Sequence, residues 1–172
     1  ARNLVTVQDA KVLQANEQLL AALLDASRDY AEEGGGSERA KIRSAAAYTL
    51  GVVGGESATD RLGEMLQDAF PNARYNAAIG LCRHGDTRAV PVLLAMLDAQ
   101  NSQVVEGEVS DSERVRKRSL VMMKAIRAAG RLAARKPVSG LSDLRDRLAQ
   151  IRDSDLPQAL QNAASEALTR FP

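Results

Sequence analysis

Apolar residues recur along this chain at spacings of about three and four positions, which is the pattern of amphipathic α-helices rather than of strands. The first such stretch, residues 8–33, carries its valines and leucines at helical spacing and predicts one long helix. Three glycines at residues 34–36 are expected to end it, because glycine readily adopts the left-handed conformation in which helices stop. Ser37 is then expected to cap the helix that follows.

The next part of the chain contains an internal repeat. The segment IRSAAAYTLGVVGGESATDRLGEMLQD, residues 42–68, aligns with ARYNAAIGLCRHGDTRAVPVLLAMLDA, residues 73–99, at a constant offset of 31 without a gap. The aligned positions include Arg43 with Arg74, Leu50 with Leu81, and Gly54 with Gly85. Each glycine lies between two helical halves, where a helix C-terminus favours a left-handed residue. Each repeat is therefore predicted to be a helix pair.

Continuing this register along the chain predicts four helix pairs, at residues 8–53, 57–84, 87–134 and 141–171. A lone pair cannot bury its apolar face, so neighbouring pairs are expected to stack into a single repeat domain over residues 1–172. The third pair contains a long insertion, residues 99–113, which is polar and acidic. The chain opens at Ala1 without an initiator Met, so we expect a processed product or a fragment of a longer chain.

The aligned segments resemble the second helix of the HEAT repeat family, in the short variant also found in phycobilin lyase subunits. They share its arginine, its paired alanines and its leucine before a terminal glycine. The family places an Asp six residues ahead of that arginine, a spacing that Asp68 and Arg74 match, whereas the last unit carries Gln161 in place of the arginine. The resemblance implies an all-α solenoid of about four stacked antiparallel helix pairs, whose second helices line a concave surface.

Composition supports the helical prediction and indicates the cellular compartment in which the protein is expected. The chain has 29 Ala and 21 Leu against 13 Val and 4 Ile, a balance that favours helix over strand. Its formal charge is +1, which excludes binding driven by net charge alone. A single cysteine cannot close an intrachain disulfide, which fits a reducing, cytoplasmic setting. The longest stretch without charged residues has 12 positions, too few for a membrane span.

Candidate catalytic and metal-binding residues are scarce. One His and one Cys are too few for a structural zinc site or an acid–base triad. His84 is expected to complement the dipole at the end of its helix, and Cys82 is expected to be a packed thiol. The glycine-rich segments lack the Lys and Ser or Thr of a phosphate loop. No catalytic residue, metal or cofactor is predicted, and the protein is not expected to be an enzyme.

One predicted helix, residues 114–136, holds nine Lys and Arg residues and no acid. At about 100° per residue, one side of this helix is apolar and another is cationic. The apolar side consists of Val115, Met122, Ile126, Ala129, Leu132 and Ala133. The cationic side, a candidate partner-binding surface, consists of Arg116, Lys117, Lys124, Arg127, Arg131 and Arg135.

Two interpretations of these cations stay open. In the simpler one they are solvated and are neutralised by acids of the insertion upstream and by Asp143 and Asp146 downstream. In the other, the second-helix position implied by the resemblance places them on or beside the concave groove. The acidic insertion would then shield the basic groove until a partner displaces it.

These features favour a non-catalytic protein–protein interaction or scaffolding module that binds a partner along the concave helical face. Arginines supply bidentate contacts to carboxylates, so an acidic segment of a protein is a suitable partner. One alternative is nucleic-acid binding through the basic helix, residues 114–136. The other is a bilin lyase-like subunit, which only the resemblance supports.

Overall fold

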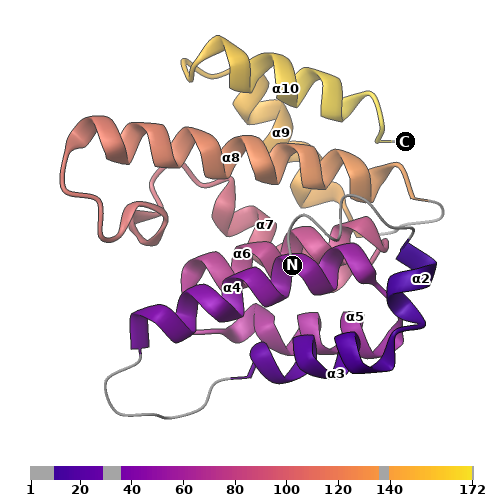
Figure 1. The fold of residues 1–172 in the computed structure, drawn as a ribbon. Helices are drawn as coiled ribbons and strands as arrows, with labels where there is room; N and C mark the ends of the chain where they lie inside the picture. The colour runs from indigo at the N-terminus through magenta and orange to yellow at the C-terminus, as the bar shows by residue number, and fades with distance from the viewer. Residues whose placement is uncertain (1–9, 29–35, 136–139, 172) are drawn as a thin grey trace. The chain divides into compact units, whose positions relative to one another are not determined.

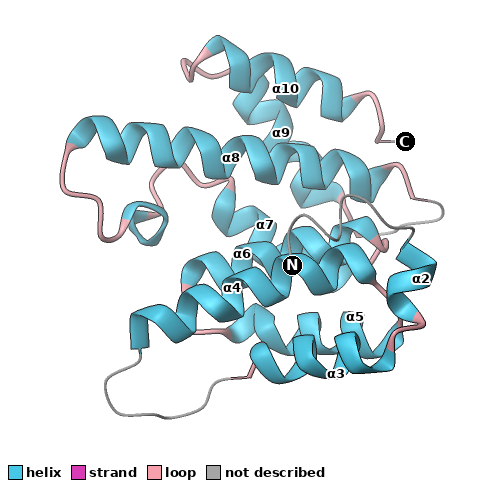
Figure 2. Ribbon diagram, in the orientation of Figure 1, coloured by secondary structure: helices cyan, strands magenta, loops and turns pink. Residues whose placement is uncertain are grey.

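The computed structural model describes residues 10–28, 36–135 and 140–171, and within these ranges it contains helices and no β-strand (Figures 1 and 2). The predicted all-α class of stacked helix pairs is confirmed. The chain divides into two compact units, Ala1–His84 and Gly85–Pro172. That the whole chain forms a single domain stays a prediction.

The first unit contains two helix pairs. Its helices are α2 (Ala10–Gln14), α3 (Glu17–Ala26), α4 (Gly36–Val53), α5 (Glu56–Glu64), the short 3-10 helix η1 (Met65–Gln67) and α6 (Pro71–Arg83). The prediction of one long helix over residues 8–33 is wrong, because the chain breaks between α2 and α3. Asn16 causes the break: its side chain accepts a hydrogen bond from the backbone N–H of Leu19 and so starts a new helix.

The start of α4 also differs from the prediction. The helix begins at Gly36, so Ser37 lies inside it instead of capping it. Its other end agrees with the sequence: Gly54 has a φ of 70°, in the left-handed region that glycine tolerates best. The preceding glycines, residues 34 and 35, lie outside the described residues.

The second helices of the first unit, α4 and α6, run side by side and are in close contact. Gly51 and Gly80 face each other where the helices meet, and a Cβ atom on Gly51 would lie 2.5 Å from the Cα of Gly80. Leu50 and Leu81, which align in the repeat, are both completely buried. Burial of a leucine side chain contributes roughly 1.5–3 kcal/mol, so the aligned apolar positions hold the pair together.

A buried ion pair joins α4 to the turn before α6. The guanidinium of Arg43 donates to both carboxylate oxygens of Asp68, at 2.8 and 3.1 Å, and each side chain is only 6% exposed. The same carboxylate accepts the backbone N–H of Phe70 at 2.8 Å. Arg74, which the family spacing relates to Asp68, instead donates to the backbone oxygens of Asp68 and Ala69. Asp68 thus pairs with Arg43 of α4, the second helix of the preceding pair.

The remaining two residues with candidate chemistry lie at the end of α6. Cys82 is a buried free thiol, as predicted. His84 follows the last helical residue, and its Nε2 is 3.0 Å from the carbonyl oxygen of Gly51. Its ring also lies against Gly54, where a Cβ atom would collide with it. His84 therefore caps the C-terminus of the preceding second helix, a role that single-helix reasoning missed.

The second unit also contains two helix pairs. Its helices are the 3-10 helix η2 (Thr87–Ala89), α7 (Val90–Met96), the 3-10 helix η3 (Ser102–Val105), α8 (Asp111–Ala133), α9 (Ser142–Arg152) and α10 (Gln158–Leu168). The second helices α8 and α10 run in the same direction (Figure 1). They meet at Gly130, where a Cβ atom would lie 3.2 Å from the Cβ of Ala167. Gly85, which opens this unit, has a φ of 78°.

In the last helix pair, Gln161 stands at the position of the repeat arginine and contacts the backbone of the preceding turn, as that arginine does. Its side-chain amide donates to the backbone oxygens of Ser154 and Leu156, at 2.9 and 2.7 Å. Arg74 makes the equivalent contacts in the first unit, with two backbone oxygens of the turn that precedes its helix. A shorter neutral side chain can therefore fasten the same turn.

Candidate functional site

The basic helix predicted over residues 114–136 is α8, which spans Asp111–Ala133. It begins earlier than predicted because Ser110 and Glu113 form a capping box. Ser110 Oγ accepts the N–H of Glu113, and the Glu113 carboxylate accepts the N–H of Ser110. It also ends earlier, so Arg135 lies beyond the last turn, and residue 136 lies outside the described residues.

The apolar side of α8 is mostly as predicted. Met122, Ile126, Ala129, Leu132 and Ala133 are buried. Val115 contradicts the prediction, since it is 59% exposed. The reason is a difference in length: α8 has 23 residues and α10 has 11, so the first turns of α8 extend beyond the part that packs on α10.

The insertion, residues 99–113, is not the loop that was predicted. It contains η3, buries Val104, and gives its last three residues to α8. Its acidic residues contact the first turns of α8. Lys117 Nζ lies 2.8 Å from a carboxylate oxygen of Glu108 and 3.1 Å from the backbone oxygen of Glu106. Arg114 Nε donates to the backbone oxygen of Glu108 at 3.2 Å.

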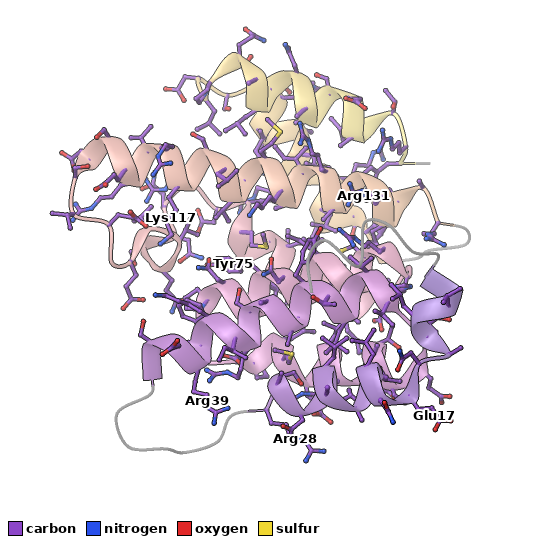
Figure 3. All side chains as sticks on the ribbon, in the orientation of Figure 1. Glu17, Arg28, Arg39, Tyr75, Lys117 and Arg131 are labelled. Atoms are coloured by element: carbon purple, nitrogen blue, oxygen red, sulfur yellow. The ribbon has the colours of Figure 1, made fainter. Side chains whose placement is uncertain are left out.

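The six predicted partner-binding cations lie in different surroundings along and beyond α8. Lys117 is held by the insertion at one end of α8, whereas Arg131 lies toward the other end (Figure 3). Arg116 and Lys124 are exposed and are not among the residues that line the groove between α8 and α10, and the side-chain carbons of Arg135 lie against Gly85. Of the six cations, Arg127 and Arg131 line that groove.

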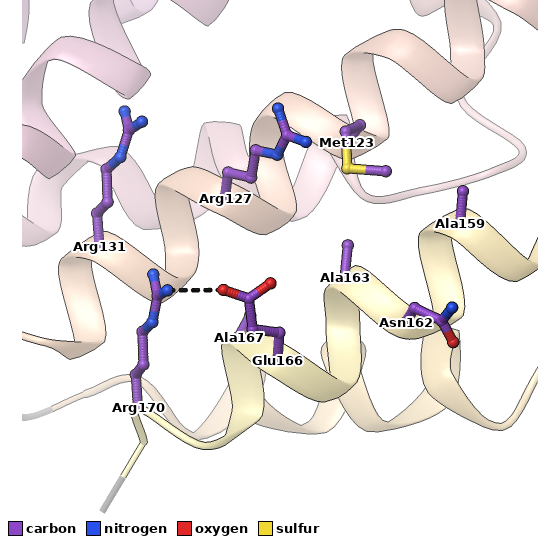
Figure 4. Close-up of a pocket in the computed structure, with 9 residues that line it drawn as sticks. All are labelled: Met123, Arg127, Arg131, Ala159, Asn162, Ala163, Glu166, Ala167 and Arg170. Carbon is purple, nitrogen blue, oxygen red and sulfur yellow. Dashed lines mark hydrogen bonds and ion pairs between the residues drawn. The ribbon is translucent and has the colours of Figure 1, made fainter.

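This groove lies between α8 and α10 and has a volume of about 660 Å³. Small and charged side chains from both helices line it (Figure 4). Its lining consists of Met123, Arg127, Arg131, Ala159, Asn162, Ala163, Glu166, Ala167 and Arg170. Charged residues gather toward one end, whereas Met123, Ala159 and Ala163 lie toward the other, mostly apolar end, which Asn162 shares (Figure 4).

The charges in the groove are unbalanced. Glu166 and Arg170 form an ion pair on α10, with 2.9 Å between the carboxylate oxygen and the guanidinium nitrogen. Arg127 and Arg131 are exposed and make no hydrogen bond or ion pair with any residue that the structure describes. The lining therefore holds three guanidinium groups and one carboxylate, and the guanidinium groups of Arg127 and Arg131 have no partner among the described residues.

The insertion does not cover this groove. Lys117 and Arg127 are ten positions apart, or about 15 Å along a helix. The groove is lined only by residues of α8 and α10, together with Arg170 just beyond the end of α10. The hypothesis that the insertion shields the groove is therefore wrong for Arg127 and Arg131. It neutralises only the first turns of the helix.

Sequence reasoning found the α8 side of the groove and missed the α10 side. Asn162, Glu166 and Arg170 were not singled out, because nothing in the local pattern shows that α10 packs beside α8. One signal was present in the sequence. The small residues Ala159, Ala163 and Ala167 recur at helical spacing and mark a helix face that a neighbour can approach closely.

The described residues offer neither a metal-binding cluster nor a membrane span. His, Cys, Asp and Glu side chains do not gather there in groups of three or more that could hold a metal ion. Among the helices within those ranges, none is long and apolar enough to cross a bilayer.

Comparison with known proteins identifies the repeat. No curated protein sequence matches the chain. The family model described as HEAT repeats matches residues 17–112, which is more than half of the 172 residues and includes both aligned repeats. Repeats of this kind are generally scaffolds for protein interactions. The match agrees with the helix pairs described above, and the chain belongs to the HEAT repeat family.

Proposed function

We propose that this protein is a non-catalytic interaction module that holds an acidic segment of a partner protein in the groove between α8 and α10. One observation carries the proposal: Arg127 and Arg131 line the groove, are exposed, and have no partner among the described residues. Neighbouring guanidinium groups repel each other, and a bound carboxylate relieves that repulsion. Arginine suits this task because its planar fork donates two parallel hydrogen bonds to one carboxylate.

Local charge, rather than net charge, supports this proposal. The chain as a whole carries only +1, so its attraction for anions at long range is weak. Within the groove the arginines outnumber Glu166, and the lining adds an amide, a thioether and three methyl groups. Such a surface favours a ligand that combines carboxylates with small apolar side chains, as a protein segment does.

The non-catalytic part of the proposal rests on the chemistry of the lining. Glu166 is the single carboxylic acid there, and it is already paired with Arg170. A paired general acid and general base need two titratable groups whose environments separate their pKa values. The lining residues offer no such pair, and they include no His, Cys, Ser or Lys.

Binding of a fluorescent glutamate-rich peptide to the whole chain tests the proposal. We expect saturable binding that the double variant Arg127→Glu/Arg131→Glu weakens by about tenfold or more, since charge-assisted hydrogen bonds each contribute roughly 1.5–3 kcal/mol. The matched control is the double variant Arg28→Glu/Arg145→Glu, which changes the net charge by the same amount at two exposed arginines outside the groove. Equal affinity of the wild-type chain and the Arg127→Glu/Arg131→Glu variant would refute the proposal.

The same binding assay tests the nucleic-acid alternative. A duplex oligonucleotide that binds more tightly than the acidic peptide, with affinity falling steeply as salt rises, would favour phosphate contacts instead. The groove offers little for unpaired bases, because no aromatic side chain is among its lining residues. The bilin lyase-like alternative is tested by adding a linear tetrapyrrole to the protein. We expect its absorbance spectrum to stay unchanged.

A further inference from the structure

We infer that the segment bound in this groove is an α-helix that presents two acidic residues one turn apart, preceded or followed by an apolar residue one turn away. The inference rests on the proposed function and adds the conformation and spacing of the partner. Its basis is the order of residues along α8, where Met123, Arg127 and Arg131 follow one another at intervals of four.

The spacing of the arginines suits a helical partner. Residues four positions apart on a helix have Cβ atoms about 5–6 Å apart, and this holds both for Arg127 with Arg131 and for two acids of a partner helix. A partner helix that lies along α8 therefore brings one carboxylate to each guanidinium. The groove itself is bounded by two helices that run in the same direction, so a third helix can lie along it (Figure 4).

The donors and acceptors of the groove also disfavour an extended segment. The backbone N–H and C=O groups of an extended peptide need hydrogen-bond partners. The helices that form the groove cannot supply them from their backbone, because their own backbone groups are already bonded within each helix. The side chains that can accept from a peptide N–H are Asn162 and the already paired Glu166. A helix satisfies its own backbone and presents only side chains, as in other helix-in-groove complexes.

The apolar end of the groove is the reason for expecting an apolar residue beside the two acids of the partner helix. Met123, Ala159 and Ala163 lie together there, one helical turn from Arg127 (Figure 4). Alanines let a partner backbone approach closely, and the unbranched thioether of methionine adapts to the side chain that it meets. An apolar residue of leucine size, four positions from the first acid, would rest on this floor.

Glu166 restricts where the acids can lie. Its carboxylate is on the α10 side of the groove, where it pairs with Arg170. Acids on the α10-facing edge of a partner would meet an ion pair of no net charge, whereas acids on the α8-facing edge would meet Arg127 and Arg131, which have no partner among the described residues. The pair therefore selects partners whose acids lie on one edge of the helix.

Three peptides of identical composition test the inference on the whole chain. The first places an apolar residue and two glutamates at intervals of four in a helix-forming background. The second moves both glutamates to the opposite edge of the helix. The first two carry a proline at one end, and the third moves that proline to the centre, where it breaks the helix. We expect the first to bind about tenfold more tightly than either of the others, since one lost charge-assisted contact is about a factor of ten.

A charge swap supplies the matched control. Arg127→Glu is expected to weaken the first peptide by about tenfold and to bind better a version in which the glutamate opposite it is Lys. Equal binding of all three peptides overturns the helical inference while leaving the acidic-segment proposal intact. Failure of every peptide to bind overturns both. Unchanged circular dichroism of the Arg127→Glu variant shows that any loss arises at the groove.

Discussion

The two units contain the same element, a pair of second helices that run in the same direction, and they use it differently. In the first unit, α4 and α6 meet glycine to glycine at Gly51 and Gly80, and the arginine of α4 is buried in an ion pair with Asp68. In the second unit, α8 and α10 meet at Gly130 but leave a groove beside it, with exposed arginines that have no partner among the described residues. The buried arginine of the first unit stabilises the fold, whereas the exposed arginines of the second unit are the ones on which the proposed binding rests.

The largest expected difference is between the two arginine–carboxylate pairs. Asp68→Ala leaves the guanidinium of Arg43 buried without its carboxylate, and loss of one partner of a buried pair costs about 3–5 kcal/mol. Glu166→Ala removes the partner of Arg170 in a pair that is largely exposed, which costs at most about 1 kcal/mol. Urea denaturation of both variants measures the contrast. Similar losses of unfolding free energy would show that burial does not separate the two pairs.

A smaller difference is expected at the glycines where the helices meet. Gly51→Ala places a methyl group against backbone, 2.5 Å from the Cα of Gly80, and such overpacking costs about 1–3 kcal/mol or more. Gly130→Ala meets the methyl group of Ala167 at 3.2 Å, a contact that a small shift relieves. Each change also gains about 1 kcal/mol of helix propensity.

We therefore expect Gly51→Ala to lower the melting temperature and Gly130→Ala to leave it nearly unchanged. Thermal unfolding followed by circular dichroism checks both variants under identical conditions. A tolerated Gly51→Ala would mean that α4 and α6 can separate as easily as α8 and α10, and the contrast between the units would not hold.

Binding separates the groove from the rest of the basic helix. Lys124 and Arg127 are both exposed on α8, but only Arg127 lines the groove. Lys124→Glu and Arg127→Glu change the net charge equally, so long-range attraction weakens equally in both. We expect about a twofold loss of acidic-peptide affinity for Lys124→Glu and about a tenfold loss for Arg127→Glu, where a direct contact is also lost. Fluorescence anisotropy titrations measure both, and equal losses would favour binding along the whole cationic side of the helix over binding in the groove.

The smallest expected effect concerns the helix starts of the second unit. The hydrogen bond from the Ser110 side chain lowers the pKa of Glu113 below its ordinary range, with further contributions from backbone N–H groups and Arg116. Because the folded pKa is lower than the unfolded one, the capping contribution is complete above the unfolded pKa and is lost as pH falls through the folded pKa.

The first turn of α8 is therefore expected to fray in acid, whereas α10, which has no side-chain cap, gives a reference without this titration. NMR chemical shifts of residues 111–114 between about pH 7 and pH 2 follow the change, since this range spans the titration of a glutamate. The Glu113→Gln variant should remove it. Shifts that stay constant in the wild-type chain while the fold persists would contradict the capping role.

Much of the fold could be predicted because the repeat is local in sequence. Leu50 and Leu81 align at helical spacing and are both buried, and Gly54 adopts the left-handed conformation expected between two helices. The break before α3 was missed because the apolar spacing continues across it, while the Asn16 cap that causes it is a local polar contact. The exposure of Val115 was missed because it depends on where α10 ends.

Only the α8 side of the candidate site could be predicted from the sequence. The arginines of α8 follow from the charge pattern of one helix, and two of the six lie in the groove. Asn162, Glu166 and Arg170 come from a helix more than thirty residues later, and their position follows from the packing of α10 on α8. The acids of the insertion were predicted to neutralise the cations of the basic helix as a whole. In the structure the insertion folds back at η3, and Glu108 pairs with Lys117 in the first turns of α8.

The central claim is that the groove of the second unit, and not the matching helix pair of the first, is where a partner binds. NMR chemical-shift mapping of the whole chain with the helical acidic peptide tests it most directly. We expect perturbed amide signals along α8 from Met123 to Arg131 and along α10, with α4 and α6 unaffected. Perturbations centred on α4 and α6, or spread evenly over both units, would contradict the account.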